Sequence, residues 1–566
     1  MDLNELFLAR PFKIRNADEY AASSILNLFV SPTSGLATPF DFENIIVKGR
    51  MGSGKTMYLR ANHAYYISCL VPSLIAHSKE LILPVLIRLS DFQHLTKPED
   101  IYRAIIIKIV EELCSIYMYL ENMKTLADLQ AGIRYLPDTA IRAHKFAQSM
   151  RQLAALGSDE YIERVSTELG LKGGIKPKFI ELSAEFRKTN FAEIKKKPNP
   201  GIKDIEECYQ NLLEDQDGKV LLLIDEAGSL DKSFFKDNEE SSCFFEILMN
   251  QFRTAPYIRT KIAIYPNSYS DMLTETRYGD TVLLEETVTN DAGYLRYRSR
   301  AREVINNYLN PEPYVESKFK AEQVFALSER HGDCLEQLMY ASGGNMRRLI
   351  QLLDMAMDAA YSEFGQPTTV TKEHALAALK KHGESMELLF SPTDIDFLGD
   401  LVSVCKARGT YKFQFPNVPL YKYTGKSQEY NVITVDQLGS GRRATTYAFD
   451  YAYCVLKDIP THRMIDSEKI NRDRSNEEGR WLTRTATINQ EVIDHAALPG
   501  KLEGRVEFIR ADAGFITSDQ GEQFFFMRQD VIDADRRKSI MYATRLRFFP
   551  TMLGDSKQAV LLEVLS

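Results

Sequence analysis

The chain has 566 residues, of which 44% are hydrophobic and 26% are charged, and its formal net charge is −8 at pH 7. This composition excludes a largely disordered chain, because enough apolar residues are present to bury several cores, and the length predicts roughly three to five folding units. The acidic balance excludes a protein that coats nucleic acid over its whole surface, but it allows a local basic face.

The seven cysteines are scattered singly along the chain, without a CxxC pair. Their spacing predicts neither a disulfide framework nor a zinc site. The N-terminus lacks the continuous apolar core of a signal peptide, and the sequence contains no run of about eighteen apolar residues. We therefore expect a cytoplasmic protein with reduced cysteines and no membrane partner.

In chain order, the first two thirds alternate between predicted strands and helices. After a helix near 17–29, short apolar runs predict strands at 44–48, 81–89, 219–224, 261–265 and 281–285. Pro84 places the second strand at a sheet edge or a bulge, because proline cannot donate to the ladder. The third is apolar enough to be covered on both faces. This alternation predicts an α/β fold with a mostly parallel sheet, and the long helical stretch at 122–215 predicts an insertion.

The last third changes character. Residues 315–385 are wholly helical in pattern, and a helix at 393–406 follows. Aromatic, alternating runs at 411–423 and 444–454 predict strands, and residues 500–566 have an all-β pattern.

Residues 49–56 read Gly-Arg-Met-Gly-Ser-Gly-Lys-Thr and fit the phosphate-loop pattern G-x-x-x-x-G-K-[ST], between a strand and a helix. The glycines let backbone N–H groups wrap an anion, and the helix that begins near Lys55 directs its positive end at the same phosphates. Lys55 can reach the β- and γ-phosphates, and the Thr56 hydroxyl can ligate Mg²⁺. The segment predicts binding of ATP with Mg²⁺ through Gly49, Gly52, Ser53, Gly54, Lys55 and Thr56.

The apolar strand at 219–224 ends in two acids, Asp225 and Glu226. In P-loop enzymes an aspartate at this place holds the magnesium shell, and a neighbouring glutamate can act as general base on the attacking water. Acids also mark the end of many ordinary strands, but the phosphate loop upstream favours the catalytic interpretation.

With these motifs in order, residues 17–385 resemble the AAA+ ATPases, particularly the branch of origin-recognition and initiator ATPases. The resemblance implies that Asn267 senses the γ-phosphate; a turn-forming asparagine is the alternative. It also implies an arginine finger for a neighbouring subunit, either Arg277 or, as runner-up, Arg253; a solvated arginine is the alternative. The segment Gly344–Ile350 looks like the lid motif G-N-x-R-x-L-[IL], which would place Arg347 at the γ-phosphate. The alternative is an ordinary helix that begins with two exposed arginines.

The C-terminal third extends the resemblance, since initiator-like relatives carry a winged helix after the lid. Arg442 and Arg443 would then form a basic wing tip that contacts phosphates, or else flank a plain Gly-Ser-Gly turn. The last segment contains the runs Gly504–Phe508, Gly514–Ile516 and Gly521–Phe526, and through them it resembles a five-stranded cold-shock barrel. Its aromatic side chains would stack on the bases of single strands, and the residues implied are Phe508, Phe515, Phe524 and Phe526. Ala513 replaces a usual stacking aromatic and Phe526 a usual histidine, so a structural barrel or a protein-docking module stays open.

The predicted architecture is an α/β P-loop parallel sheet with a helical lid, then a mixed α+β winged-helix-like region and a small all-β OB/cold-shock-like barrel. The expected boundaries are 1–310 for the ATPase core with its insertion at about 122–215, 311–388 for the lid, 389–495 for the winged-helix-like region and 496–566 for the barrel.

The expected function is an ATP-hydrolysing AAA+ protein that assembles into a homo-oligomer with ATP and binds DNA or RNA. By analogy with systems that use initiator-like ATPases, its setting would be prokaryotic antiviral defence or mobile-element control. The alternative is an ATP-gated signalling switch that regulates a separate effector protein. A scaffold that binds ATP without hydrolysing it is disfavoured by Glu226. The residues expected in catalysis are Lys55, Glu226, Asn267, Arg277 and Arg347.

Overall fold

The computed structural model describes residues 2–112, 217–230, 249–265, 279–311, 319–327, 333–461 and 500–565, with short gaps, and a few positions between 477 and 492. Its contacts divide the chain into two compact units. Unit 1 comprises residues 1–13, 287–291 and 319–566, and unit 2 comprises residues 14–286 and 292–318. The predicted insertion at 122–215 lies outside the described residues.

Unit 2 is built on a five-stranded parallel sheet with the order β2-β3-β4-β1-β5. Its strands, which match the five predicted runs, are β1 (Ile45–Lys48), β2 (Glu80–Arg88), β3 (Asp217–Asp225), β4 (Ile258–Ile264) and β5 (Asp280–Leu283). The strand β3 lies inside the sheet, and its apolar residues from Val220 to Ile224 are all buried. The strand β2, which contains Pro84, is an edge strand, as the proline predicted.

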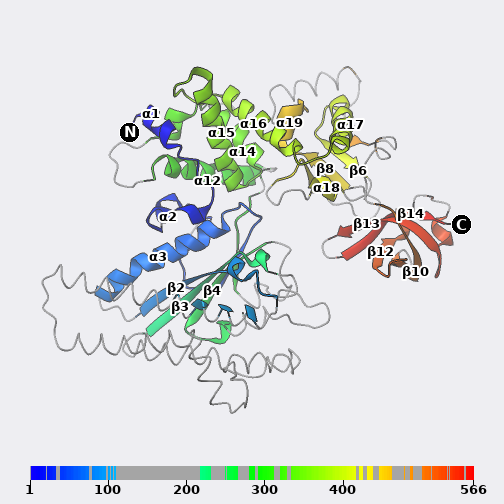
Figure 1. Ribbon diagram of the computed structural model, residues 1–566, viewed down its shortest axis with the longest axis horizontal. Coiled ribbons are helices and arrows are strands. Elements are labelled where there is room, and N and C mark those ends of the chain that lie inside the picture. The colour runs from blue at the N-terminus through cyan, green and yellow to red at the C-terminus, as the bar shows by residue number, and fades with distance from the viewer. Residues whose placement is uncertain are drawn as a thin grey trace, which may run out of the picture. The chain divides into compact units, whose positions relative to one another are not determined.

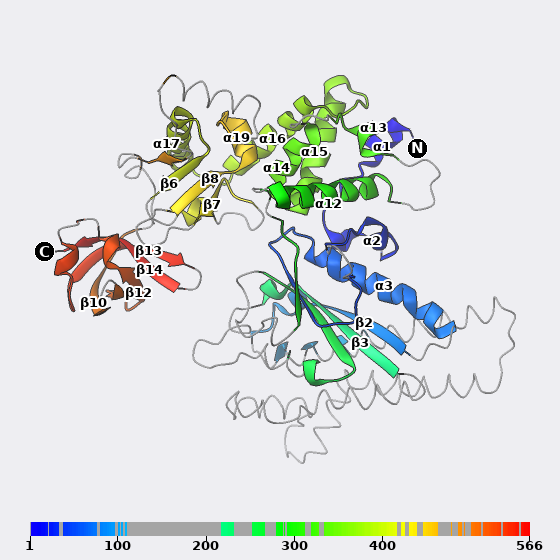
Figure 2. The ribbon, with the colours of Figure 1, turned by 180° about the vertical axis from the view of Figure 1, so that it is seen from behind.

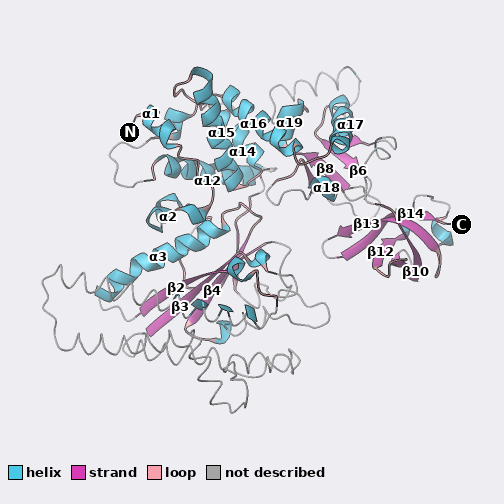
Figure 3. Ribbon diagram, viewed as in Figure 1, coloured by secondary structure: helices cyan, strands magenta, loops and turns pink. Residues whose placement is uncertain are grey.

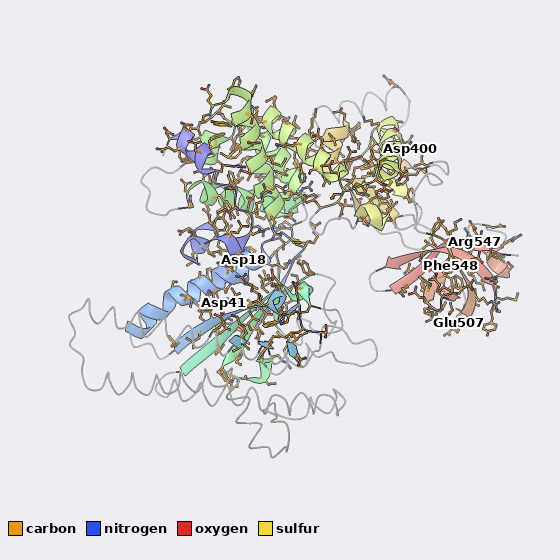
Figure 4. The ribbon with its side chains drawn as sticks, viewed as in Figure 1. Asp18, Asp41, Asp400, Glu507, Arg547 and Phe548 are labelled. Atoms are coloured by element: carbon orange, nitrogen blue, oxygen red, sulfur yellow. The ribbon has the colours of Figure 1, made fainter. Side chains whose placement is uncertain are left out.

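Among the described residues, the helices of unit 2 include α2 (Ala22–Leu28), α3 (Lys55–Ile75) and most of α12 (Asp291–Leu309). The helix α3 lies along the sheet in Figure 1, and Figure 3 shows the separation of helix and strand layers. The predicted helix near 17–29 is divided, with a 3₁₀ turn at Ala17–Glu19 before α2. In this turn Asp18, labelled in Figure 4, pairs with Arg88 at 3.3 Å and lies 4.0 Å from Arg60 of α3.

A fully buried lysine, Lys261, lies in the middle of β4. Its Nζ donates to the carbonyl oxygen of Pro39 and to Oδ1 of Asn62, each at 2.7 Å. A neutral amine has two N–H donors, which equals the number of these acceptors. Burial lowers the pKa of Lys261 from 10.5 to about 7, against the opposing charges of Asp41 and Glu43.

This lysine gives unit 2 a predicted pH dependence. Between about pH 7 and pH 10 the unfolded chain binds more protons at Lys261 than the folded chain does, so the free energy of unfolding should rise with pH in this window. In Lys261→Met the rise should disappear. The free energy of unfolding is measured by urea titration at both ends of this pH window, with hydrogen exchange of β4 as the probe of unfolding. An equal rise in the variant would contradict the assignment.

Unit 1 contains a helical bundle, which we define as α13 (Ala321–Val324), α14 (Cys334–Ser342), α15 (Met346–Phe364) and α16 (Lys372–Glu387). The N-terminal helix α1 (Leu3–Ala9) belongs to the same unit and lies beside α13 in Figure 2. Arg10 holds it there through Asp354 of α15, with Nη2 to Oδ2 at 2.7 Å, and Phe12 packs on Phe325.

A second part of unit 1, which we call the α17–β9 module, carries a four-stranded sheet with the order β7-β8-β6-β9. Its elements are α17 (Pro392–Arg408), β6 (Lys412–Phe415), α18 (Tyr421–Thr424), β7 (Ile433–Gln437), β8 (Thr445–Phe449), α19 (Tyr451–Lys457) and β9 (Ala486–Thr487). Two strand predictions here were too long. The run at 411–423 turns helical at Tyr421, and the run at 444–454 turns helical after Asp450, whose side chain caps α19 by accepting from the Ala452 N–H.

The C-terminal segment forms a closed five-stranded barrel with the order β10-β11-β12-β14-β13. Its strands are β10 (Leu502–Arg510), β11 (Ala513–Ser518), β12 (Gln523–Met527), β13 (Arg545–Leu553) and β14 (Ser556–Val564). Every pairing is antiparallel except that of β12 with β14. Figure 4 labels Glu507 on β10, and Arg547 beside Phe548 on β13. No helix in the described part of the chain is both long and apolar enough to cross a membrane.

Candidate nucleotide site

The glycine-rich loop joins β1 to the first turn of α3, as the motif predicts. Gly52 and Gly54 have φ values of 80° and 101°, a backbone region that residues with a Cβ rarely adopt. At Gly54 this allows the chain to turn into α3, where the Tyr58 N–H donates to the Gly54 carbonyl at 2.9 Å. Ser53 is buried within the loop, and its hydroxyl has no hydrogen-bond partner among the described residues.

Lys55 is almost completely buried, with 8% of its surface exposed. Its Nζ donates to the carbonyl oxygens of Gly49 at 2.7 Å and Arg50 at 2.9 Å, and lies 4.2 Å from the centre of the Tyr265 ring. The ammonium group is therefore held against the loop that would surround a phosphate.

Asp225, the last residue of β3, brings a carboxylate to the same loop. The side chain is only 4% exposed, and burial raises its pKa, while hydrogen bonds from the Thr56 hydroxyl and the Glu226 backbone N–H oppose the rise. In a parallel sheet the carboxyl ends of β1 and β3 lie at one edge, although β4 separates the two strands. This edge thus joins the hydroxyl of the phosphate loop to the strand-terminal acid, the pair that holds Mg²⁺ in P-loop ATPases.

Residues 10–68, which include this loop, match the family described as ORC-CDC6-like. The predicted resemblance to initiator-like AAA+ proteins is confirmed for this segment, and the parallel sheet fits that fold. Similar solved structures include the Aeropyrum pernix ORC2 protein in its ADPNP–ADP complexes, at 10% identity over 79% of this chain and 94% of that chain, and Drosophila ORC bound to DNA, at 12% identity over 78% and 93%. Both have a TM-score of 0.30, so the fold assignment rests on the sheet and the loop. The search of curated proteins found no match.

Glu226, the residue that follows Asp225, has an unusual backbone conformation. Its φ of 57° and ψ of 38° place it in the left-handed region, which costs a residue with a Cβ about 1–2 kcal/mol. The turn is fixed by the Ser229 N–H, which donates to the Glu226 carbonyl at 2.9 Å. Strained residues of this kind are concentrated at functional sites, so the conformation favours a role in the chemistry.

Two residues that the sequence did not single out contact the loop. Tyr265 follows β4 and contacts the Lys55 ammonium through its ring. Glu285 accepts a hydrogen bond from the Arg50 backbone N–H, and its second oxygen lies 3.2 Å from Arg50 Nε. Neither belongs to a local motif, because both come from other strand ends of the sheet; the sheet order would have been needed to find them.

The remaining predicted residues of the nucleotide site are not all within the described chain. Asn267 and Arg277 are outside it, and Arg253 is exposed. Arg347 is the second residue of α15 and belongs to unit 1, whereas the phosphate loop belongs to unit 2. Its role at the γ-phosphate stays a prediction.

The predicted nucleic-acid residues divide into exposed and buried sets. Phe508 and Phe515 are 53% and 37% exposed on the barrel. Phe524 and Phe526 are 3% and 1% exposed in the barrel core, so a stacking role for these two was a wrong prediction: alternate residues of β12 point inward. Arg442 and Arg443 lie outside the described residues.

Phe525, which lies between the buried Phe524 and Phe526 on β12, faces outward and completes a row of rings across three strands. The register pairs Phe508 with Phe515 and Phe515 with Phe525, and the last two rings are 5.7 Å apart, edge to face. Arg505 and Arg510 are exposed on β10 on either side of Phe508, and neither forms an ion pair with another described residue. Glu507 on the same strand accepts from Gln523 at 3.2 Å.

Proposed function

We propose that this protein binds ATP with Mg²⁺ and hydrolyses it, as an initiator-like AAA+ ATPase that also binds nucleic acid. The observation that carries the nucleotide part is the hydrogen bond between Thr56 and Asp225, beside the buried Lys55 ammonium. A desolvated carboxylate and a hydroxyl already in contact are oxygen donors of the kind that Mg²⁺ takes from proteins. The residues therefore fit the metal, and Thr56 and Asp225 would hold it.

The chain's own residues account for the reaction. Lys55 would exchange its two carbonyl acceptors for β- and γ-phosphate oxygens, and the N-terminus of α3 would stabilise the same charge. Glu226 would take a proton from the attacking water; the water oxygen bonds to the γ-phosphorus as the bond from that phosphorus to the bridging oxygen breaks, and ADP and phosphate leave. The chemistry that bound Mg²⁺ supplies is charge neutralisation on the β- and γ-phosphates.

The barrel supports the nucleic-acid part of the proposal. Its outer face presents the row Phe508–Phe515–Phe525 with an exposed arginine on each side. Aromatic rows stack unpaired bases, and arginines contact the phosphates between them. The closed five-stranded barrel with one parallel pairing supports an OB-like fold. One face of the sheet in such barrels commonly binds single-stranded nucleic acid.

Substitution of the two exposed rings tests this surface. Phe508→Ala with Phe515→Ala should weaken binding of a single-stranded oligonucleotide by about 10-fold or more, since each stacked base contributes about 1–3 kcal/mol. Fluorescence anisotropy measures the affinity, and near-native circular dichroism shows that the barrel stays folded. Phe364→Ala with Tyr361→Ala, on exposed rings of α15, is the matched control. Unchanged affinity in the barrel variant would reject the stacking surface.

The proposed function as a whole is tested by ATPase turnover and particle size with and without single- and double-stranded DNA and RNA. Turnover or assembly that rises with one of these nucleic acids supports the proposal. If turnover does not change with any of these four nucleic acids and an effector protein copurifies, the result supports the signalling switch instead. Absence of turnover under every condition rejects hydrolysis.

A further inference from the structure

The first turn of the helix α15 contains two adjacent arginines, Arg347 and Arg348, whose environments differ. Arg347 is the candidate contact for the γ-phosphate. Arg348 is 3% exposed, and its backbone N–H donates to the capping side chain of Asn345 at 3.0 Å. The first turn of α15 is therefore fixed at Arg348, one residue from the proposed sensor.

The buried guanidinium of Arg348 makes a two-pronged contact with Asp450. Its Nη1 donates to Oδ2 at 2.7 Å and its Nη2 to Oδ1 at 2.8 Å. The Asp450 side chain is 8% exposed, and its Oδ1 also caps α19 through the Ala452 N–H at 2.9 Å. One carboxylate thus joins the N-terminus of α15 in the helical bundle to the N-terminus of α19 in the α17–β9 module.

Two further side chains contact this ion pair. Arg348 Nε donates to His382 Nε2 of α16 at 3.2 Å, which requires the His382 proton to be on Nδ1. The Tyr430 ring lies 4.7 Å from the guanidinium carbon and 4.7 Å from the His382 ring. Figures 1 and 2 both show α19 beside α16. A planar arginine held by a bidentate carboxylate and an aromatic face has one allowed orientation, so the two parts cannot rotate against each other while the pair is intact.

We propose that Arg348 and Asp450 form a latch that makes the α17–β9 module move with α15, so that a nucleotide contact at Arg347 is transmitted to this module. The inference rests on the proposed function, because it requires α15 to respond to ATP. Arg348 and Asp450 are positioning residues and touch no substrate. Their role is to convert a local change at the helix start into a change in the orientation of a second module.

Hydrogen exchange of the full-length protein, with and without a non-hydrolysable ATP analogue, tests the latch. In the wild type, peptides from α15 and α19 should both change their exchange rates. In Asp450→Asn the change in α15 should persist, while the change in α19 should fall at least about threefold. Asparagine is a good N-cap, so α19 keeps its capping bond. A full α19 response in this variant would overturn the latch.

Two further variants separate coupling from instability. Arg348→Met combined with Asp450→Asn leaves no buried charge unpaired, and it should uncouple α19 without the stability loss expected of the single change. Asp354→Asn breaks the pair with Arg10 elsewhere on the same helix, and it should preserve the α19 response. If the ATP analogue changes hydrogen exchange in α15 but not in α19 of the wild type, the latch alone is rejected. If it changes exchange in neither helix, nucleotide sensing is rejected and the latch with it.

Discussion

Replacement of Lys55 by alanine should weaken ATP binding by about 100-fold, measured by calorimetry with Mg²⁺-ATP. The buried ammonium is the one side-chain cation held inside the described part of the loop, and a hydrogen bond between charged groups contributes about 1.5–3 kcal/mol. The change also removes the stem that packs near Tyr265.

Lys55→Met separates these two losses, because it keeps an unbranched side chain of similar length but no charge. Both variants should lose affinity alike if the ammonium matters. Lys412→Met, which breaks the ion pair with Asp436 in the other unit, is the matched control and should bind ATP normally. Wild-type affinity in either Lys55 variant would show that the loop does not hold a triphosphate.

Glu226→Gln should bind ATP with unchanged affinity but hydrolyse it about 10²- to 10⁴-fold more slowly, the usual contribution of a positioned base. Glutamine has the same shape and backbone preferences, so the left-handed turn at this residue should survive. Steady-state turnover and calorimetry on the same preparation provide the two measurements. The variant should also accumulate ATP-bound assemblies, visible as larger particles.

Glu286→Gln is the matched control for Glu226, since its carboxylate lies in the same unit and pairs with Arg296 at 3.2 Å. Its turnover should stay within about twofold of the wild type, as for an exposed surface pair. Equal turnover in Glu226→Gln and the wild type would exclude Glu226 as the base.

The phosphate loop and the acid pair could be predicted because each is a contiguous motif whose neighbours along the chain fix its structure. The Thr56–Asp225 contact followed from strands that end at one edge of a parallel sheet. The Arg348–Asp450 pair could not be predicted, since it joins positions 102 residues apart that no motif connects. The lid motif predicted a role for Arg347 but gave no sign that its neighbour Arg348 was buried.

Two wrong predictions, the strand at 444–454 and the outward faces of Phe524 and Phe526 in β12, have local causes. Residues 451–457 are rich in aromatic and β-branched side chains, which favours a strand, but the Asp450 cap and the packing against α16 and α14 favour a helix instead. In β12 the run Phe524–Phe526 shows that alternate rings share a face, but not which face is inward. The closure of the barrel decides that Phe525 points out.

The contacts within the phosphate loop have a consequence for how strongly a nucleotide can bind. Lys55 already has two carbonyl acceptors, and Glu285 already holds the Arg50 backbone N–H and lies beside its guanidinium. An incoming triphosphate must compete with these partners, so its affinity reflects an exchange of bonds and not a simple gain. This competition raises the nucleotide concentration at which the loop is half occupied, and the carboxylate of Glu285 contributes to that rise.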